Sequence, residues 1–329
     1  MAIPRTRRKK TFRDELSTRY WAYQKERFPQ WQRYFERDKS DDGRPPVFLK
    51  SEEQRNIISD PDARDRDHTR LLALIPRAER HLWFRSMNSS QALAQSVLGN
   101  LAVFDQMFVL ADMKDDEGES LFGAAVLQSD AFSMEHPVNF LGEIGPRITK
   151  VDGFISGEYR VAIECKFIES EVGSCSRPRL TERDANFAQD HCDGTFRAQR
   201  NRSKRCSLTE VGILYWEFVP QLFRWRADVD LSPCPLRANY QLVRNILASG
   251  VRPGGRVVPD QGHAILLYDS RNPAFNPGGE GFKAYVETRE GLLEPAMLRR
   301  CSWQRIVDHL RRKRILDWLT KELALKYGL

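Results

Sequence analysis

One stretch of the chain, TKVDGFISGEYRVAIECKF at residues 149–167, constrains the fold more than any other. Two short runs of alternating character flank the turn-forming sequence SGEY, and this pattern predicts a β-hairpin. Because successive side chains of a strand point to opposite faces, Glu164 and Lys166 share one face. A turn centred on Glu158 places Asp152 directly across from Glu164, and the same register makes the apolar faces of the two strands coincide.

The predicted hairpin thus carries two carboxylates and an ammonium in apolar surroundings. Facing carboxylates repel each other, and their burial is unfavourable unless a cation compensates. Hard oxygen ligands favour Mg²⁺ or Mn²⁺, and such an ion polarises a phosphoryl oxygen and lowers the pKa of a bound water. Lys166 would orient that water or stabilise charge developing on the phosphate. Asp152, Glu164 and Lys166 therefore predict metal-assisted phosphodiester hydrolysis, whereas an ion pair on a surface hairpin is the plainer interpretation.

The D-x11-E-x-K pattern resembles the signature of the PD-(D/E)XK nuclease superfamily, which has the restriction-endonuclease-like fold. The stretches FRSMNSSQALAQSVLGNL, VDGFI, AIECKF and YQLVRN together resemble one prokaryotic branch of that superfamily, and they lie between Phe84 and Asp269. The resemblance implies a metal ion held by Asp152, Glu164 and the backbone carbonyl of Cys165. It also implies that Lys166 is the catalytic lysine and that DNA is the substrate.

The sequence departs from the superfamily pattern at two places. Val151 stands where a proline usually precedes the first aspartate. Members often carry an acidic residue on the first helix, but this helix offers only Gln91 and Gln95. Glu143, on the preceding predicted strand, is the substitute candidate for a further metal ligand.

The rest of the chain predicts an α/β fold, a restriction-endonuclease-like core with a mixed β-sheet flanked by helices. We expect a helical N-terminal region with a basic tail at 1–86, and a nuclease-like domain at 87–329 with a cysteine-rich insertion at about 170–236. Predicted helices cover Thr11 to about Arg37, a segment capped by Asn88 or Ser89, YQLVRNILASG ended by Gly250, and one or two closing helices at 302–327. Predicted strands are PVNFLGEI, TKVDGFI, RVAIECKF, HAILLYD and FKAYVET.

Four of the six cysteines lie in the predicted insertion: Cys175, Cys192, Cys206 and Cys234. Four thiolates could hold Zn²⁺ or an iron–sulfur cluster, and His191 could replace one of them. Their spacing fits no short zinc-finger template, and reduced thiols packed under the insertion explain them equally well. With no CxxC pair and no export signal, we expect thiols or metal ligands rather than disulfides, in the reducing cytoplasm.

The net charge of +7 is compatible with a nucleic-acid partner. The cluster RAQRNRSKR lies in the predicted insertion, and other basic runs are RTRRKK, RPRLTERD and LRRKR. Candidate nucleic-acid contacts are Arg197, Arg200, Arg202, Lys204, Arg205, Gln241 and Arg244, although a solvated face explains such charges as well. No apolar run is long enough to predict a membrane-spanning helix.

Three hypotheses follow from the sequence. The first is a metal-dependent DNA nuclease, acting as a homodimer if it cuts both strands. The second is a non-catalytic nucleic-acid-binding protein on a nuclease-like scaffold. The third is an interaction module in which the hairpin charges form only an ion pair.

Overall fold

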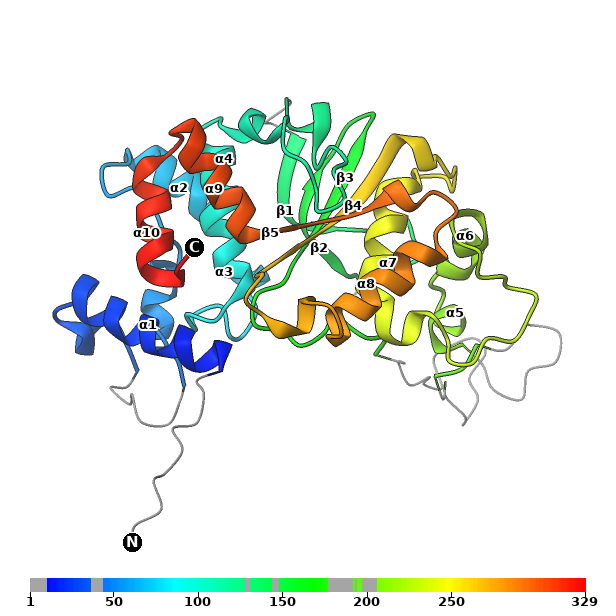
Figure 1. Ribbon diagram of the computed structural model, residues 1–329, viewed down its shortest axis with the longest axis horizontal. Helices are drawn as coiled ribbons and strands as arrows, with labels where there is room; N and C mark the ends of the chain where they lie inside the picture. Colours follow the sequence, from blue (N-terminus) through cyan, green and yellow to red (C-terminus); the bar gives the residue numbers. More distant parts are fainter. Residues whose placement is uncertain are drawn as a thin grey trace, which may run out of the picture.

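The structure is a computed structural model that describes residues 11–36, 44–127, 131–143, 148–176, 192, 194–196 and 206–329. Its centre is one five-stranded sheet with the strand order β1-β2-β3-β4-β5 (Figure 1). The strands are β1 Phe132–Pro137, β2 Lys150–Ile155, β3 Arg160–Cys165, β4 Gly262–Tyr268 and β5 Leu298–Ser302. The first three strands pair antiparallel and the last three pair parallel, which confirms the predicted mixed sheet.

The hairpin of β2 and β3 has the register that the sequence predicted. Gly153 pairs with Ile163 and Ile155 pairs with Val161, so the turn is centred on Glu158. A slip by one residue would exchange the side chains that the hairpin presents to the two faces of the sheet, and it would separate Asp152 from Glu164.

Helices cover both faces of the sheet (Figure 1). On one face, Ile163 and Cys165 share an apolar core with residues of α1, α3, α4, α9 and α10. On the other face, Ala162 and Leu266 share a second core with residues of α5, α6, α7 and α8. The helices of the first face are α1 Phe12–Arg27, α3 Ser90–Ala94, a π-helical continuation Gln95–Gly99, α4 Asn100–Val103, α9 Trp303–Lys313 and α10 Asp317–Tyr327, with α2 Asp65–Ala73 packed on α4. Those of the second face are α5 Ser207–Glu210, α6 Tyr215–Leu222, α7 Leu236–Gly250 and α8 Glu280–Gly291.

Several helix ends agree with the sequence signals. The Ser89 side chain accepts a hydrogen bond from the backbone N–H of Ala92, as an N-cap does. Helix α7 ends at Gly250, and the closing segment forms the two helices α9 and α10. These termini position α3 and α7, the two helices that contribute side chains to the site described below.

Two strand predictions were wrong. The run PVNFLGEI contributes only Pro137 to β1, which instead begins at Phe132 and contains the polar residues Ser133, Glu135 and His136. Since β1 is an edge strand, it does not need a continuous apolar sequence. The run FKAYVET lies in helix α8, whose buried residues Gly281, Ala284, Tyr285 and Thr288 have helical spacing.

The N-terminal region packs on the sheet domain. Leu16 and Tyr20 of α1 belong to the same apolar core as Ile163 of β3 and Tyr327 of α10. The boundary between residues 86 and 87 stays a prediction, and the basic tail at 1–10 lies outside the described residues. None of the helices in the described part of the chain combines the length and apolar character that a membrane crossing requires.

Candidate active site

Three carboxylates occupy matching positions on three adjacent strands. Because Met134 pairs with Gly153 and His136 with Val151, Glu135 of β1 lies across from Asp152 of β2. The hairpin register then places Asp152 across from Glu164 of β3. Glu135 has a φ of 48°, a backbone conformation that is uncommon for residues other than glycine and often occurs at functional sites.

Glu164 is the most enclosed of the three carboxylates, with only 1% of its surface exposed. Its Oε1 lies 2.8 Å from the Nζ of Lys166. Its Oε2 accepts a hydrogen bond of 2.7 Å from Nδ2 of Asn245 and lies 3.3 Å from a guanidinium nitrogen of Arg244. Burial opposes the charge of Glu164, but Lys166 and Arg244 outweigh it, so the pKa of Glu164 is lowered and the group is ionised.

The pKa values of Asp152 and Glu135, unlike that of Glu164, are raised. Burial raises the pKa of Asp152 well above its usual range, and the neighbouring charge of Glu164 raises it further. Burial likewise raises the pKa of Glu135, with a smaller contribution from Glu164. Asp152 accepts a hydrogen bond of 2.6 Å from the backbone N–H of Cys165, and Glu135 accepts one of 2.6 Å from Nε2 of Gln91. Burial is thus the main reason why these two carboxylates resist ionisation, and repulsion by Glu164 adds to it.

Lys166 is held between these carboxylates and α7. Its Nζ donates a 2.7 Å hydrogen bond to Oε1 of Gln241, and its backbone carbonyl accepts one of 3.0 Å from Nε1 of Trp303. Burial would lower the pKa of Lys166, but the charges of Glu164 and Asp152 raise it above the usual range. The side chain is therefore a cation at neutral pH and cannot serve as a general base there.

The chemistry of this donor set suits a hard divalent cation. Carboxylate oxygens are its preferred ligands, and one or two of them with waters are sufficient for Mg²⁺. Asp152, Glu164, Glu135 and the carbonyl of Cys165 are the groups that could hold it. Within the described part of the chain, no three His, Cys, Asp or Glu side chains already form a group that could hold a metal ion. Lys166, Arg244 and Asn245 occupy the oxygens of Glu164 instead.

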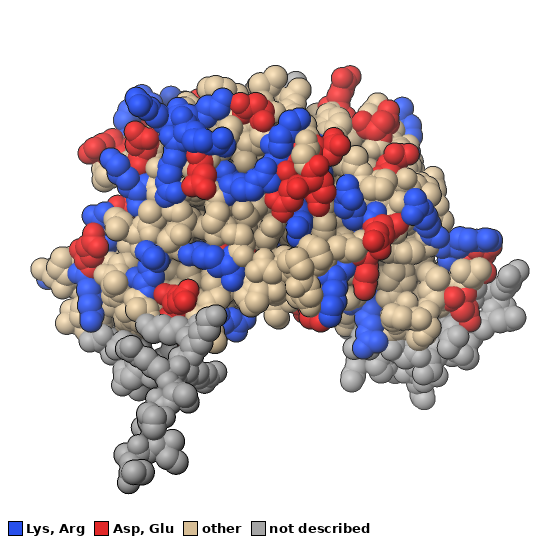
Figure 2. Space-filling model, viewed as in Figure 1, with Lys and Arg blue, Asp and Glu red and all other residues tan. Residues whose placement is uncertain are grey.

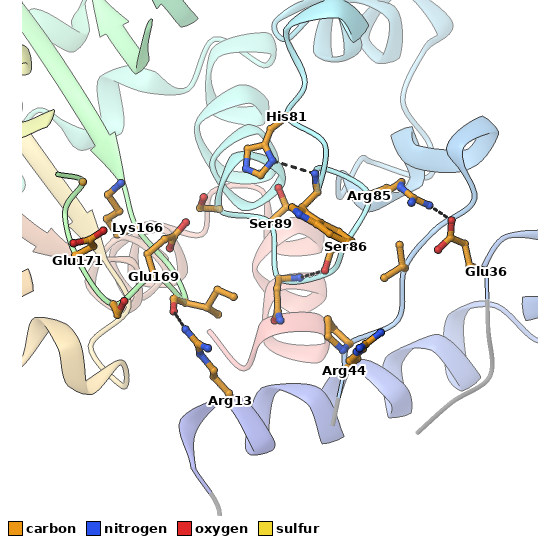
Figure 3. A pocket seen from close by; sticks show the side chains of 18 of the residues that line it. Arg13, Glu36, Arg44, His81, Arg85, Ser86, Ser89, Lys166, Glu169 and Glu171 are labelled. Carbon is orange, nitrogen blue, oxygen red and sulfur yellow. Dashed lines mark hydrogen bonds and ion pairs between the residues drawn. The ribbon is translucent and has the colours of Figure 1, made fainter. Parts of the chain in front are cut away.

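A groove of about 970 Å³ opens beside Lys166. Figure 3 shows Arg13 of α1 below it, the segment from His81 to Ser89 on one side, and Lys166, Glu169 and Glu171 on the other. Arg13 donates a 2.9 Å hydrogen bond to the carbonyl of Ile168 and so ties α1 to the segment that follows β3.

The walls of this groove carry mixed charge and one exposed aromatic ring. Arg44 and Arg85 supply positive charge, and Arg85 pairs with Glu36 across the groove wall. Trp83 also lines the groove and keeps 57% of its surface exposed. An indole exposed in a groove next to cations can stack on a nucleic-acid base.

The structure brings two of the predicted nucleic-acid contacts into the site. Gln241 binds Lys166, and Arg244 binds Glu164. Arg244 is only 4% exposed, so its guanidinium acts on Glu164 within the protein. The other five, Arg197, Arg200, Arg202, Lys204 and Arg205, lie outside the described residues.

Glu143 lies in a separate polar cluster. Its carboxylate accepts hydrogen bonds from the backbone N–H of Thr149, at 2.7 Å, and from the Tyr215 hydroxyl. These partners satisfy the hydrogen-bonding capacity of the Glu143 carboxylate. Its role as a metal ligand stays a prediction.

The four cysteines of the predicted insertion gather around a small cavity next to the start of α7. Cys165 and Cys301 lie instead in the core of the opposite sheet face. The six cysteines, all of them among the described residues, form no disulfide with one another. His191 lies outside the described residues.

Sequence reasoning missed Glu135 and Asn245. Glu135 lies in a polar stretch that was not predicted as a strand, so nothing aligned it with Asp152. Asn245 directly follows Arg244 in the YQLVRN segment, and the asparagine at the end of that motif was its only signal.

Basic and acidic side chains are interleaved on the face shown in Figure 2. A basic group lies at the end of α9, where Arg311, Arg312 and Lys313 form the last turn. Arg311 pairs with Asp308 and Lys313 with Asp112, as expected for a solvated surface.

Comparison with protein families gives a match that extends well beyond the hairpin. A family model described as "Restriction Endonuclease associating with ARP" matches residues 23–328. No curated protein and no solved structure matches the chain.

Proposed function

Since the chain belongs to the family of restriction endonucleases associating with ARP, we propose that it hydrolyses phosphodiester bonds of DNA at the Asp152–Glu164–Lys166 site. One observation supports this proposal more than any other. The carboxylates of Glu135, Asp152 and Glu164 lie on adjacent strands and face one another beside Lys166. A structural ion pair needs only one carboxylate next to Lys166, so three of them favour a site that receives a cation.

We infer that this cation is Mg²⁺ or Mn²⁺. Asp152, Glu164 and the backbone carbonyl of Cys165 would hold it, with Glu135 as a further acidic residue held in place by Gln91. When bound, the ion polarises a phosphoryl oxygen and lowers the pKa of a bound water. The Glu164 carboxylate would then bind the ion while it still accepts hydrogen bonds from the donors around it.

Lys166 acts as a fixed positive charge in this proposal. Glu164 and Gln241 hold its ammonium group at the edge of the groove, and its raised pKa keeps it protonated. It therefore stabilises negative charge that develops on the phosphate and orients the attacking water through its N–H groups. Gln241, Arg244 and Asn245 hold Lys166 and Glu164 in position from α7.

We propose that the groove beside Lys166 receives the DNA. Arg13, Arg44 and Arg85 would contact phosphates, while Trp83 offers a stacking surface for a base. Cutting both strands of a duplex requires two sites, which favours a homodimer. We further propose that the protein acts in the reducing cytoplasm, where its six cysteines would stay free of disulfides.

A second function has one observation in its favour. Both oxygens of Glu164 already have protein partners, an arrangement that a non-catalytic nucleic-acid-binding protein on a nuclease-like scaffold could retain. Such a protein would bind DNA without Mg²⁺ and release no products.

The two functions differ in a nuclease assay. The protein is incubated with supercoiled, linear and single-stranded DNA, with Mg²⁺ or with EDTA, beside the Asp152→Asn and Asp67→Asn variants. Asp67 of α2 is a buried carboxylate outside the site. The nuclease proposal expects cleavage that requires Mg²⁺, is lost in Asp152→Asn and persists in Asp67→Asn. DNA that is bound but intact under every condition would support the binding protein instead.

A further inference from the structure

Four cysteines that are distant in the sequence line one cavity at the start of α7. Cys175, Cys192, Cys206 and Cys234 surround a space of about 10 Å³. This volume corresponds to roughly one water-sized sphere, so the cavity admits a single atom and no larger group. The rest of its lining is Gly194, Ser207, Leu208, Leu236 and Arg237.

Backbone hydrogen bonds hold the cysteine-bearing segments together. The N–H of Cys175 donates to the carbonyl of Arg237 at 3.1 Å, and that of Cys234 donates to the carbonyl of Gly194 at 2.9 Å. The N–H of Cys192 donates to Oγ of Ser207 at 3.1 Å, and Ser207 directly follows Cys206. Hydrogen bonds of the cysteines' own backbone N–H groups thus hold these segments around the cavity.

One of the sulfur atoms also accepts a backbone N–H group. Gly194 donates to Sγ of Cys192 at 3.3 Å, two residues after that cysteine. N–H donors stabilise a thiolate and orient it, which a cysteine packed only as a small apolar residue does not need.

From this geometry we propose that Cys175, Cys192, Cys206 and Cys234 bind one Zn²⁺ and that the ion fixes the start of α7. Four thiolates in a closed tetrahedral set are typical of structural zinc, with Zn–S distances of about 2.3 Å. A cavity for one atom fits a single ion and leaves no room for an iron–sulfur cluster. Since no three ligand-type side chains among the described residues yet form such a group, the sulfurs turn toward the centre when the ion binds.

The site has a direct connection to the nuclease site. Cys234 lies two residues before α7, and the same helix carries Gln241, Arg244 and Asn245. An ion that anchors the start of α7 therefore also anchors the residues that hold Lys166 and Glu164. Zinc binding can be tested independently of cleavage, because metal content, the cobalt spectrum and thermal stability do not depend on catalysis.

The experiment uses the full-length protein, produced with zinc in the medium and purified under reducing conditions. Elemental analysis should find about one zinc per chain. Exchange for Co²⁺ should give the visible bands of a tetrahedral thiolate site, and thermal denaturation should shift to lower temperature after chelation. Iron with inorganic sulfide, or the absence of any metal together with no cobalt spectrum, would overturn the proposal.

Two variants with a matched control locate the ion. Cys206→Ser and Cys234→Ser should lose most of the zinc, whereas Cys301→Ser changes a buried cysteine outside the cluster and should keep it. If a cluster variant fails to fold, the cobalt spectrum of the parent and the protection of its four thiols from alkylation by zinc still decide the question. Full zinc content in a folded Cys206→Ser or Cys234→Ser protein would contradict the assignment.

Discussion

Replacement of Asp152 by asparagine should make the protein more stable while abolishing cleavage. Asp152 faces like charges on Glu135 and Glu164 and an opposite charge on Lys166, and its pKa is raised by burial and by Glu164. Asparagine has nearly the same shape and can still accept the hydrogen bond from the N–H of Cys165. The substitution therefore removes a repulsive charge and leaves the packing intact.

The size of the effect follows from the geometry. Side chains on facing residues of antiparallel strands lie about 5 Å apart. At that distance, two like charges repel by about 3 kcal/mol at the effective dielectric constant of a protein site. Attraction to Lys166 offsets one of the two repulsions, and the weaker neutral hydrogen bond to Cys165 subtracts about 1 kcal/mol. The net gain is about 2 kcal/mol, or an increase in Tm of roughly 3 °C for a chain of 329 residues.

Calorimetry with and without metal checks this reasoning. In EDTA, Asp152→Asn should melt above the parent. In Mg²⁺ at about 100 times the dissociation constant, the parent should gain about 2.7 kcal/mol and the variant little. Asp67→Asn changes a buried carboxylate outside the site, so it controls for loss of a charge and should keep the Mg²⁺ response. A variant that melts below the parent in EDTA would refute the argument, since Asp152 would then be a stabilising partner of Lys166.

Three further predictions concern single side chains. Lys166→Met should lower the cleavage rate at least about 100-fold, because the charge beside the phosphate is lost, and a rate within about twofold of the parent would exclude that role. Glu135→Gln should require about 10- to 100-fold more Mg²⁺ for half-maximal cleavage, and an unchanged Mg²⁺ titration would remove Glu135 from the metal site. His263 is buried, and loss of hydration lowers its pKa to about 3, whereas the unfolded chain has the ordinary value of about 6.5. Its neutral form therefore contributes stability above pH 6.5 that is lost as the pH falls toward 3, by about 2 kcal/mol between pH 7 and pH 5. Guanidinium unfolding at both pH values should show a smaller drop for His263→Gln, and an equal drop would show that His263 is not responsible.

The part of the fold that the sequence predicted best is the β2–β3 hairpin. The register predicted from the apolar residues of its two strands is the one observed, and it also aligns Asp152 with Glu164. The capping signal at Ser89 and the glycine at position 250 marked helix ends for the same reason, because both act through the local backbone.

Features that depend on contacts between residues distant in the sequence could not be predicted from the sequence. The residues of FKAYVET alternate as in a strand, but packing of Ala284 and Tyr285 in the core shared with α7 selects a helix. Glu135 joins Asp152 only through pairing of β1 with β2, and β1 is a polar edge strand. Arg244 and Asn245 reach Glu164 across 80 and 81 residues of sequence, a proximity that only the tertiary fold creates.

The most direct test of the central claim is a calorimetric titration of the metal-free protein with Mn²⁺. If the carboxylates of β1, β2 and β3 form a cation site, the parent and Asp67→Asn should show saturable heat that disappears in Asp152→Asn. Equal binding heat in the parent and Asp152→Asn, or no saturable heat in either, would contradict a metal site at this position.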